Sequence, residues 1–184
     1  SMSGIITAGL NRSSGLMKAV SAGGSTTPGF CAYRGADGCS GDSCVIYFGD
    51  NTYTEAIYNH EEYDSDNCYD PSNGRFTPNV AGDYFILAQA HLRCHTDRYV
   101  DSYVEIRKNG SIVAGTRHSG EQSGGYSYDA EQVMRCSTIV NLNGSSDYVS
   151  VFIKLDVTTG SPIFQGGNNT GTRRPSQFMG FKLG

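Results

Sequence analysis

Residues 69–86 read YDPSNGRFTPNVAGDYFI, and this stretch decides the fold of the chain. Pro71 and Gly74 bracket a tight turn, because proline fixes its φ angle and glycine accepts a positive one. Pro78 lacks the amide hydrogen that strand pairing requires, so it ends a short strand. Gly82 lets the backbone bend into a long apolar strand. The order of turn, short strand and long strand indicates an all-β domain.

The long strand continues to residue 93 and is apolar on both faces. Tyr84 and Ile86 lie on one face and Phe85 and Leu87 on the other, because side chains alternate along a strand. A two-sheet sandwich covers only one face of such a strand with its core. The second face needs another cover, and a neighbouring subunit is the simplest candidate. We therefore assign these four residues to a subunit contact.

Most of the remaining chain also alternates with a period of two. Residues 149–155 place their aliphatic side chains on one face, and residues 99–107 place Val100, Val104 and Ile106 opposite Tyr99 and Tyr103. Asn-Gly pairs at 109–110 and 143–144 predict tight hairpins, since both residue types accept positive φ. The pattern predicts half-buried, mostly antiparallel strands and no helix.

Composition and motifs exclude several functions. The net charge is -4, with no basic footprint for phosphates, so we expect no nucleic-acid partner. No run of 18 apolar residues occurs, so we expect no membrane insertion. No Gly-x-Ser-x-Gly motif is present, and no serine or cysteine has a motif-supported histidine partner. We therefore expect neither an enzyme nor a cofactor.

The chain divides into two parts. Residues 1–28 lack a sustained period and end in a cluster of Gly, Ser, Thr and Pro, which predicts an extended or attachment segment. Residues 29–184 form one domain. Ser1 before Met2 resembles a protease-cleavage remnant, so we expect the native start at Met2 and no trimmed secretory signal.

Six cysteines are many for a cytosolic chain of this size and suggest an oxidising environment. They allow fifteen pairings, and none forms a Cys-x-x-Cys motif. We expect one to three disulfides, the rest being buried thiols. We pair Cys94 with Cys136, because both fall in long strands, and Cys39 with Cys44 across a short loop.

An acidic stretch, NHEEYDSDNCYD at residues 59–70, contains Asp64 and Asp66. Carboxylates at this density are ligands that calcium prefers. The stretch lacks the glycine and the twelfth-position glutamate of a calcium loop, so we favour a solvated acidic loop, with calcium as the alternative. The same alternatives apply to Asp37 and Asp42.

Tyrosines provide candidate ligand contacts, since their side chains are amphipathic and lose little entropy on binding. Tyr126 and Tyr128 lie in the loop-like stretch SGGYSYD, where packing explains exposed aromatics poorly. Tyr99 and Tyr103 are further candidates. The alternative is ordinary cross-strand pairing on a sheet exterior.

The spacing within residues 69–86 resembles the globular head of complement component C1q, a jelly roll shared with tumour necrosis factor (TNF) ligands. The matching residues are Tyr69, Asp70, Gly74, Phe76, Gly82, Tyr84 and Phe85. Residues 30–34, FCAYR, and 177–183, QFMGFKL, resemble the first and last strands of that family. The resemblance implies a ten-stranded antiparallel jelly-roll sandwich that forms a homotrimer. It also implies that the terminal strands lie together, and it adds Phe178 and Phe181 to the trimer interface.

Several phrases, such as RKNGSIVA at residues 107–114, resemble C1q-like domains of bacteriophage virion proteins. This resemblance implies a virion surface or tail-fibre protein that contacts a host cell-surface glycan or protein and other virion proteins. A purely structural decoration protein is one alternative. A secreted C1q-domain recognition protein is the other.

Overall fold

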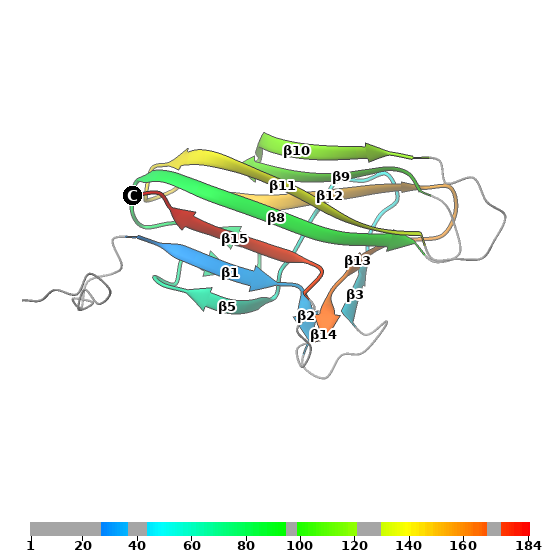
Figure 1. The fold of residues 1–184 in the computed structure, drawn as a ribbon, viewed down its shortest axis with the longest axis horizontal. Helices are drawn as coiled ribbons and strands as arrows, with labels where there is room; N and C mark the ends of the chain where they lie inside the picture. Colours follow the sequence, from blue (N-terminus) through cyan, green and yellow to red (C-terminus); the bar gives the residue numbers. More distant parts are fainter. Residues whose placement is uncertain (1–26, 37–43, 95–98, 121–129, 169–173) are drawn as a thin grey trace, which may run out of the picture.

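Fifteen strands and no α-helix are formed by the residues that the computed structural model describes, namely 27–36, 44–94, 99–120, 130–168 and 174–184. Most belong to two antiparallel sheets that lie face to face, with the long strands along the longest axis of the molecule (Figure 1). This confirms the predicted jelly-roll sandwich. The count exceeds ten because short segments, such as β6 (Tyr69–Asp70) and β7 (Arg75–Phe76), are separate strands. Within the described ranges, no helix is long and apolar enough to cross a membrane.

The first sheet has seven strands and is built around β8 (Gly82–Cys94). One edge of β8 pairs along its whole length with β11 (Ala130–Leu142). Its other edge is shared, because β15 (Gln177–Lys182) pairs with the first half and β13 (Pro162–Gln165) with the second. The remaining strands of this sheet are β1 (Gly29–Tyr33), β3 (Val45–Tyr47) and β5 (His60–Asp64).

The second sheet has six strands and is built around β12 (Val149–Val157). One edge of β12 pairs with β9 (Tyr99–Lys108), which continues to the edge strand β10 (Ser111–Ser119). The other edge of β12 pairs with β4 (Thr54–Glu55) and with β7, which in turn pairs with β6. A small parallel sheet joins β2 (Gly35–Ala36) to β14 (Gly167–Asn168).

The predicted turn between Pro71 and Gly74 is present. The Asp70 carbonyl accepts a hydrogen bond from the Gly74 amide at 2.8 Å, and Gly74 has a φ of 71° that favours glycine. The Asp70 carboxylate also accepts hydrogen bonds from the Ser72 amide and hydroxyl. The turn thereby sets Tyr69 opposite Phe76, with both side chains in the core.

The terminal strands lie side by side, as predicted. β1 pairs with β15 in antiparallel register, with Ala32 opposite Phe178. Gly180 lies on β15 where the strand crosses the core most closely, since a Cβ at this position would lie 2.6 Å from Ile86 Cδ1. Within the F-x-G-F pattern of β15, Phe178 and Gly180 are therefore required by packing of the core.

Aromatic rings from both ends of the sequence meet between the two sheets. Phe30 of β1 stacks on Phe76 at 4.3 Å and on Tyr69 at 5.0 Å between ring centroids. Its edge contacts Phe178 of β15 at 4.8 Å. Tyr84 contacts Phe76 from β8, and its hydroxyl donates a hydrogen bond to the Val80 carbonyl. These rings, which we call the aromatic cluster, are all buried.

The strand faces follow the predicted alternation, with one exception in β9. Along β12 the four aliphatic residues at 149, 151, 153 and 155 are all buried. In β9, the pairing with β12 shifts between Asp101 and Tyr99, which leaves Val100 as an extra residue. This β-bulge turns Val100 outward, with 38% exposure, and turns Tyr99 toward the core. The prediction for these two side chains was therefore wrong.

We expect Phe178→Ala to lower the free energy of unfolding by about 3 to 5 kcal/mol, because it removes a fully buried ring from the aromatic cluster. Equilibrium unfolding in urea measures this. Ile112→Ala, at a side chain that is 60% exposed, is the matched control and should change stability by less than about 0.5 kcal/mol. Equal losses for the two variants would contradict the central position of Phe178.

Candidate functional site

The outward-facing side of the first sheet presents a band of apolar side chains across five strands. Phe85 of β8 lies between Ile139 of β11 and Phe181 of β15, and its ring is 5.5 Å from that of Phe181. One row along, Leu87 lies beside Met179, and the row continues through β1 to β5. We call this band the outer apolar face, formed by Cys31, Tyr63, Phe85, Leu87, Ile139, Met179 and Phe181.

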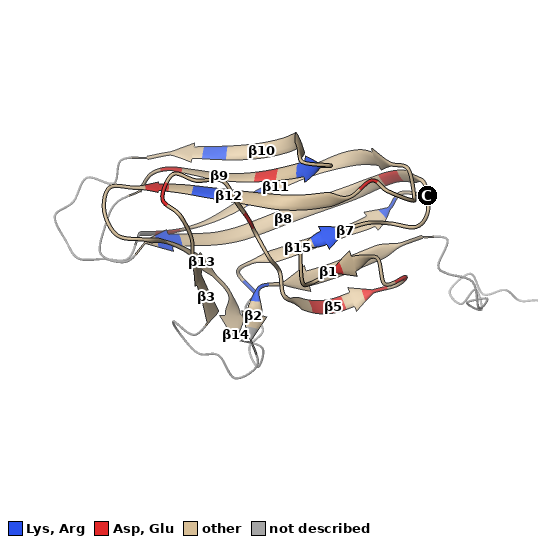
Figure 2. Ribbon diagram, turned by 180° about the vertical axis from the view of Figure 1, so that it is seen from behind, with Lys and Arg blue, Asp and Glu red and all other residues tan. Residues whose placement is uncertain are grey.

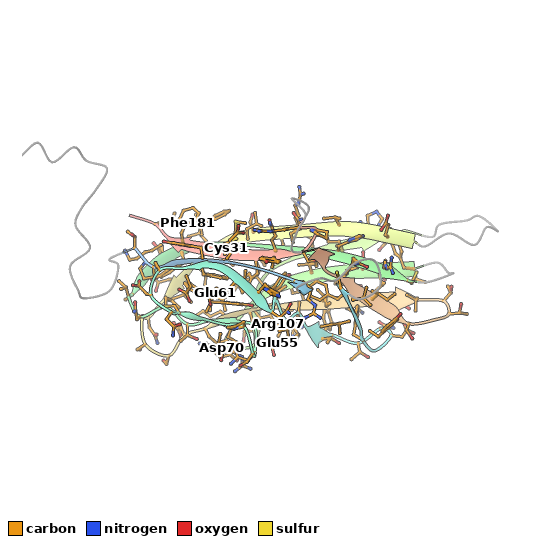
Figure 3. The ribbon with its side chains drawn as sticks, turned by 90° about the horizontal axis from the view of Figure 1, so that it is seen from below. Cys31, Glu55, Glu61, Asp70, Arg107 and Phe181 are labelled. Atoms are coloured by element: carbon orange, nitrogen blue, oxygen red, sulfur yellow. The ribbon has the colours of Figure 1, made fainter. Side chains whose placement is uncertain are left out.

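The outer apolar face is open to solvent in the single chain. Ile139 is 63% exposed, Tyr63 is 56% exposed and Phe181 is 51% exposed. Figure 3 views the sandwich on edge, with Phe181 and Cys31 at one surface and Asp70, Glu55 and Arg107 toward the opposite one. Neighbouring exposed apolar side chains on several strands are typical of an interaction surface.

The structure divides the six residues predicted for the trimer interface. Phe85, Leu87 and Phe181 belong to the outer apolar face. Tyr84, Ile86 and Phe178 are 0% exposed in the chain's own core, so they cannot contact another subunit, and their assignment was wrong. Sequence reasoning missed Ile139, Met179, Cys31 and Tyr63, because only the strand register places them beside Phe85 and Leu87.

The other half of the same sheet face is polar. His91 lies beside Glu131, with its Nε2 atom 2.9 Å from a carboxylate oxygen, and Arg135 donates a hydrogen bond to Gln89. Burial lowers the pKa of His91 below its ordinary value of 6.5, and this effect outweighs the attraction of Glu131. The sheet face therefore combines an apolar half with a half of paired polar groups.

We expect the free energy of unfolding to fall as the pH drops below about 6.5, because unfolded His91 takes up a proton that the folded chain disfavours. The contribution is present above the unfolded pKa and is lost as the pH falls toward the lower folded pKa. Urea unfolding between pH 7.5 and pH 5 measures this. His91→Gln should reduce the pH dependence, and an unchanged profile would contradict the assignment.

The predicted ligand-contact tyrosines have different outcomes. Tyr126 and Tyr128 lie outside the described residues. Tyr99 packs against the core through the β9 bulge, with its ring 6.1 Å from that of His118. Tyr103 lies on the outward side of the second sheet, where the Lys154 ammonium lies 4.4 Å from its ring centroid. Among the described residues, Tyr103 is therefore the predicted contact tyrosine that faces outward from its sheet.

The two carboxylates considered as alternative calcium ligands, Asp64 and Asp66, have structural partners. Asp64 accepts hydrogen bonds from the backbone amides of Asp66 and Tyr69, the second at 2.7 Å. Asp66 accepts one from the Ser65 hydroxyl. Among the described residues, no group of three or more His, Cys, Asp and Glu is placed to hold a metal ion. Asp37 and Asp42 lie outside those residues. The Asp64 carboxylate therefore orders the chain that leads into β6.

The two predicted disulfides differ in outcome. Cys44 is disulfide-bonded, and its predicted partner Cys39 lies outside the described residues. The predicted bond between Cys94 and Cys136 is wrong, because Cys136 lies opposite Ala88, six positions along β8 from Cys94. Six positions span about 20 Å in a strand. Both are buried thiols, and burial raises the pKa of Cys136 to about 11.

Alkylation of the unfolded chain without reductant should modify Cys31, Cys68, Cys94 and Cys136 and leave Cys44 unmodified until reductant is added. In the folded chain Cys136 should react slowly, since a buried thiol with a raised pKa holds little thiolate at neutral pH. Mass spectrometry of the peptides measures both. Protection of Cys94 and Cys136 in the unfolded, unreduced chain would contradict their assignment as thiols.

These features define the class of fold: an all-β sandwich of the C1q/TNF-like jelly-roll type. Solved structures show the same fold at low sequence identity. The globular domain of zebrafish complement 1qA protein matches with 14% identity and a TM-score of 0.51, over 85% of this chain and 98% of that chain. Eiger TNF from S. frugiperda matches with 10% identity and a TM-score of 0.53, over 86% and 92%. Murine APRIL matches with 12% identity and a TM-score of 0.53, over 85% and 99%. No protein-family model and no curated protein sequence matches the chain.

Proposed function

We propose that this chain is a non-enzymatic binding module that acts as a homotrimer on the surface or a tail fibre of a bacteriophage particle, where it contacts the host cell. The outer apolar face carries this proposal. Phe181 and Ile139 are more than half exposed on a sheet whose other face is already covered by the core. A second copy of the chain would remove these side chains from water.

The fold supports a trimer in particular. The structure shares the C1q/TNF-like jelly roll with its structural neighbours, and the family that residues 69–86 resemble is trimeric. In a threefold ring each subunit presents two different surfaces, one to each neighbour. Three copies would also multiply weak contacts with a cell surface, with gains on the order of a hundredfold to ten-thousandfold.

We expect the mass in solution to be three times the chain mass of 19.8 kDa. Leu87→Asp and Phe181→Asp should each shift the chain toward monomer, because either one places a charge within the apolar contact. Sedimentation equilibrium at micromolar concentration measures this. Ile112→Asp, on the outward side of the second sheet, is the control and should stay trimeric. A monomeric wild-type mass would overturn the trimer.

Cys31 provides an independent probe of the same contact. Its side chain is half-buried on the outer apolar face of the single chain. A trimer that covers this face should slow alkylation of the Cys31 thiol. Alkylation should become faster in Leu87→Asp, and equal rates would place the contact elsewhere.

The assignment to a virion is supported by the resemblance of sequence phrases to phage proteins. Competition for adsorption tests it: saturating purified protein should reduce binding of the phage to its host. A decoration protein, which binds only the particle, would leave adsorption unchanged. The secreted alternative draws its support from the number of cysteines. It is weakened because four of the six are thiols.

A further inference from the structure

The outward side of the second sheet contains a buried hydroxyl between two arginines. Ser150 of β12 points outward, since Val149 and Val151 on either side of it point into the core. Register places Arg107 of β9 on one side of Ser150 and Arg75 of β7 on the other. Ser150 is only 1% exposed, although it lies on the exterior side of its sheet.

The next row repeats the arrangement with carboxylates. Phe152 of β12 lies between Glu105 of β9 and Glu55 of β4. Two guanidinium groups and two carboxylates thus surround one hydroxyl and one ring, and their formal charges balance. Basic and acidic residues are likewise interspersed on this side of the molecule (Figure 2).

On the β9 side of this arrangement, Arg107 and Glu105 are hydrogen-bonded to each other. Arg107 donates to Glu105 through Nε at 2.9 Å and through Nη2 at 2.6 Å. The Arg107 guanidinium also lies 4.0 Å from the ring centroid of Phe152 and 4.9 Å from that of Tyr53. Glu105 is 6% exposed. Arg107 and Glu105 are therefore held in place by their contacts with each other and with the rings of Phe152 and Tyr53.

On the other side of β12, Arg75 and Glu55 are not hydrogen-bonded to each other. Arg75 Nε and Glu55 Oε1 lie 3.5 Å apart, and neither of these buried atoms makes a hydrogen bond. The Ser150 hydroxyl has no hydrogen-bond partner either. Buried polar atoms without partners are rare, and each requires an explanation. An ion pair whose facing atoms make no hydrogen bond and a hydroxyl without a hydrogen-bond partner therefore lie on adjacent rows of the sheet.

The chemistry of these groups points to hydroxyl groups as their partners. A hydroxyl both donates and accepts, so it can accept from Arg75 Nε and donate to Glu55 Oε1. Two carboxylates disfavour an anion, and two guanidinium groups disfavour a cation. Two tyrosine rings border the area: Tyr53, which is 38% exposed, and Tyr148, whose ring centroid lies 4.4 Å from the Arg75 guanidinium. Such rings offer apolar surface to the carbon side of a sugar.

We propose that Glu55, Arg75 and Ser150 form a binding site for a neutral saccharide on the outward side of the second sheet. This proposal deepens the proposed function and rests on it, since it gives the chemical class of the cell-surface ligand. The Arg75 side chain is 41% exposed and contacts Glu55 at 3.5 Å and the ring of Tyr148. In this proposal a ligand displaces the Arg75 side chain to reach Ser150.

Titration with methyl glycosides of glucose, galactose and mannose, followed by NMR of the wild-type protein, tests the site. One monosaccharide in such a site should bind with a Kd on the order of 1 mM. Glu55→Gln and Arg75→Gln should each weaken binding about tenfold or more, because charged groups make the stronger hydrogen bonds. Arg117→Gln removes a 58% exposed arginine of β10, paired with Asp101, and is the matched control with unchanged affinity.

Ser150→Ala separates a ligand contact from a structural role. It removes a buried hydroxyl without a partner, so the melting temperature should stay constant or rise, while affinity for the same glycoside falls. Unchanged affinity in Glu55→Gln, Arg75→Gln and Ser150→Ala would overturn the site. Absence of binding by all three glycosides would also overturn it.

Two further measurements distinguish this failure from failure of the proposed function. If the protein is trimeric and blocks phage adsorption but binds none of the glycosides, the saccharide site is wrong and the binding module stands. If glycosides bind through Glu55 and Arg75 but adsorption is unaffected, the site stands and the host-contact role is wrong.

Discussion

The aromatic cluster is the interaction on which the rest of the structure depends. Phe30, Tyr69, Phe76 and Phe178 come from the first strand, the last strand and the short β6–β7 hairpin between them. Their ring centroids lie 4.3 to 6.0 Å apart where they contact. They join the two sheets, because β1 and β15 belong to the first and β6 and β7 to the second. With these rings in place, β15 can pair with both β1 and β8. The outward sides of the two sheets are thereby fixed.

This interior leaves each sheet with a different exterior. On the first sheet the odd-numbered positions of β8 place Phe85 and Leu87 beside apolar residues of β11 and β15. On the second sheet the outward positions of β9 and β12 carry charged residues, two of them, Glu105 and Arg107, in direct contact. One side is thus suited to exclude water and the other to form directed hydrogen bonds. Subunit association and ligand recognition can therefore occupy opposite surfaces of one small sandwich.

The sequence predicted features that depend on local chemistry. The turn at Gly74 and the hairpin at Asn109 and Gly110 are present with positive φ, because these residue types select that backbone conformation. The face assignments along β12 are confirmed for the same reason, since alternation is a property of one strand. The bulge at Val100 was not predictable, because it arises in the pairing of β9 with β12. One inserted residue reverses which of Tyr99 and Val100 faces inward.

Features that depend on register were predicted less well. Both faces of β8 are apolar, which indicated correctly that the core would cover only one of them. The sequence could not show that Tyr84 and Ile86 face the core while Phe85 and Leu87 face outward. Cys94 and Cys136 do lie in neighbouring strands, as the proposed disulfide required. The disulfide is wrong because the register places them six positions apart along β8. The Ser150 site had no sequence signal, because Glu55, Arg75 and Arg107 meet only when β4, β7 and β9 flank β12.

The pairing of the first and last strands has a mechanical consequence. β1 begins, and β15 ends, at the same end of the sandwich, where the Lys182 amide donates a hydrogen bond to the Pro28 carbonyl. Antiparallel hydrogen bonds run perpendicular to the strands. A force that pulled the two ends of the chain apart would break these bonds one after another, at low load. A force that pulled the chain before Pro28 away from a ligand bound farther along the sandwich would act along the strands. It would stretch many inter-strand hydrogen bonds at the same time. If the N-terminal segment attaches the domain as proposed, a bound ligand would therefore load the domain in shear, the direction in which paired strands resist force best.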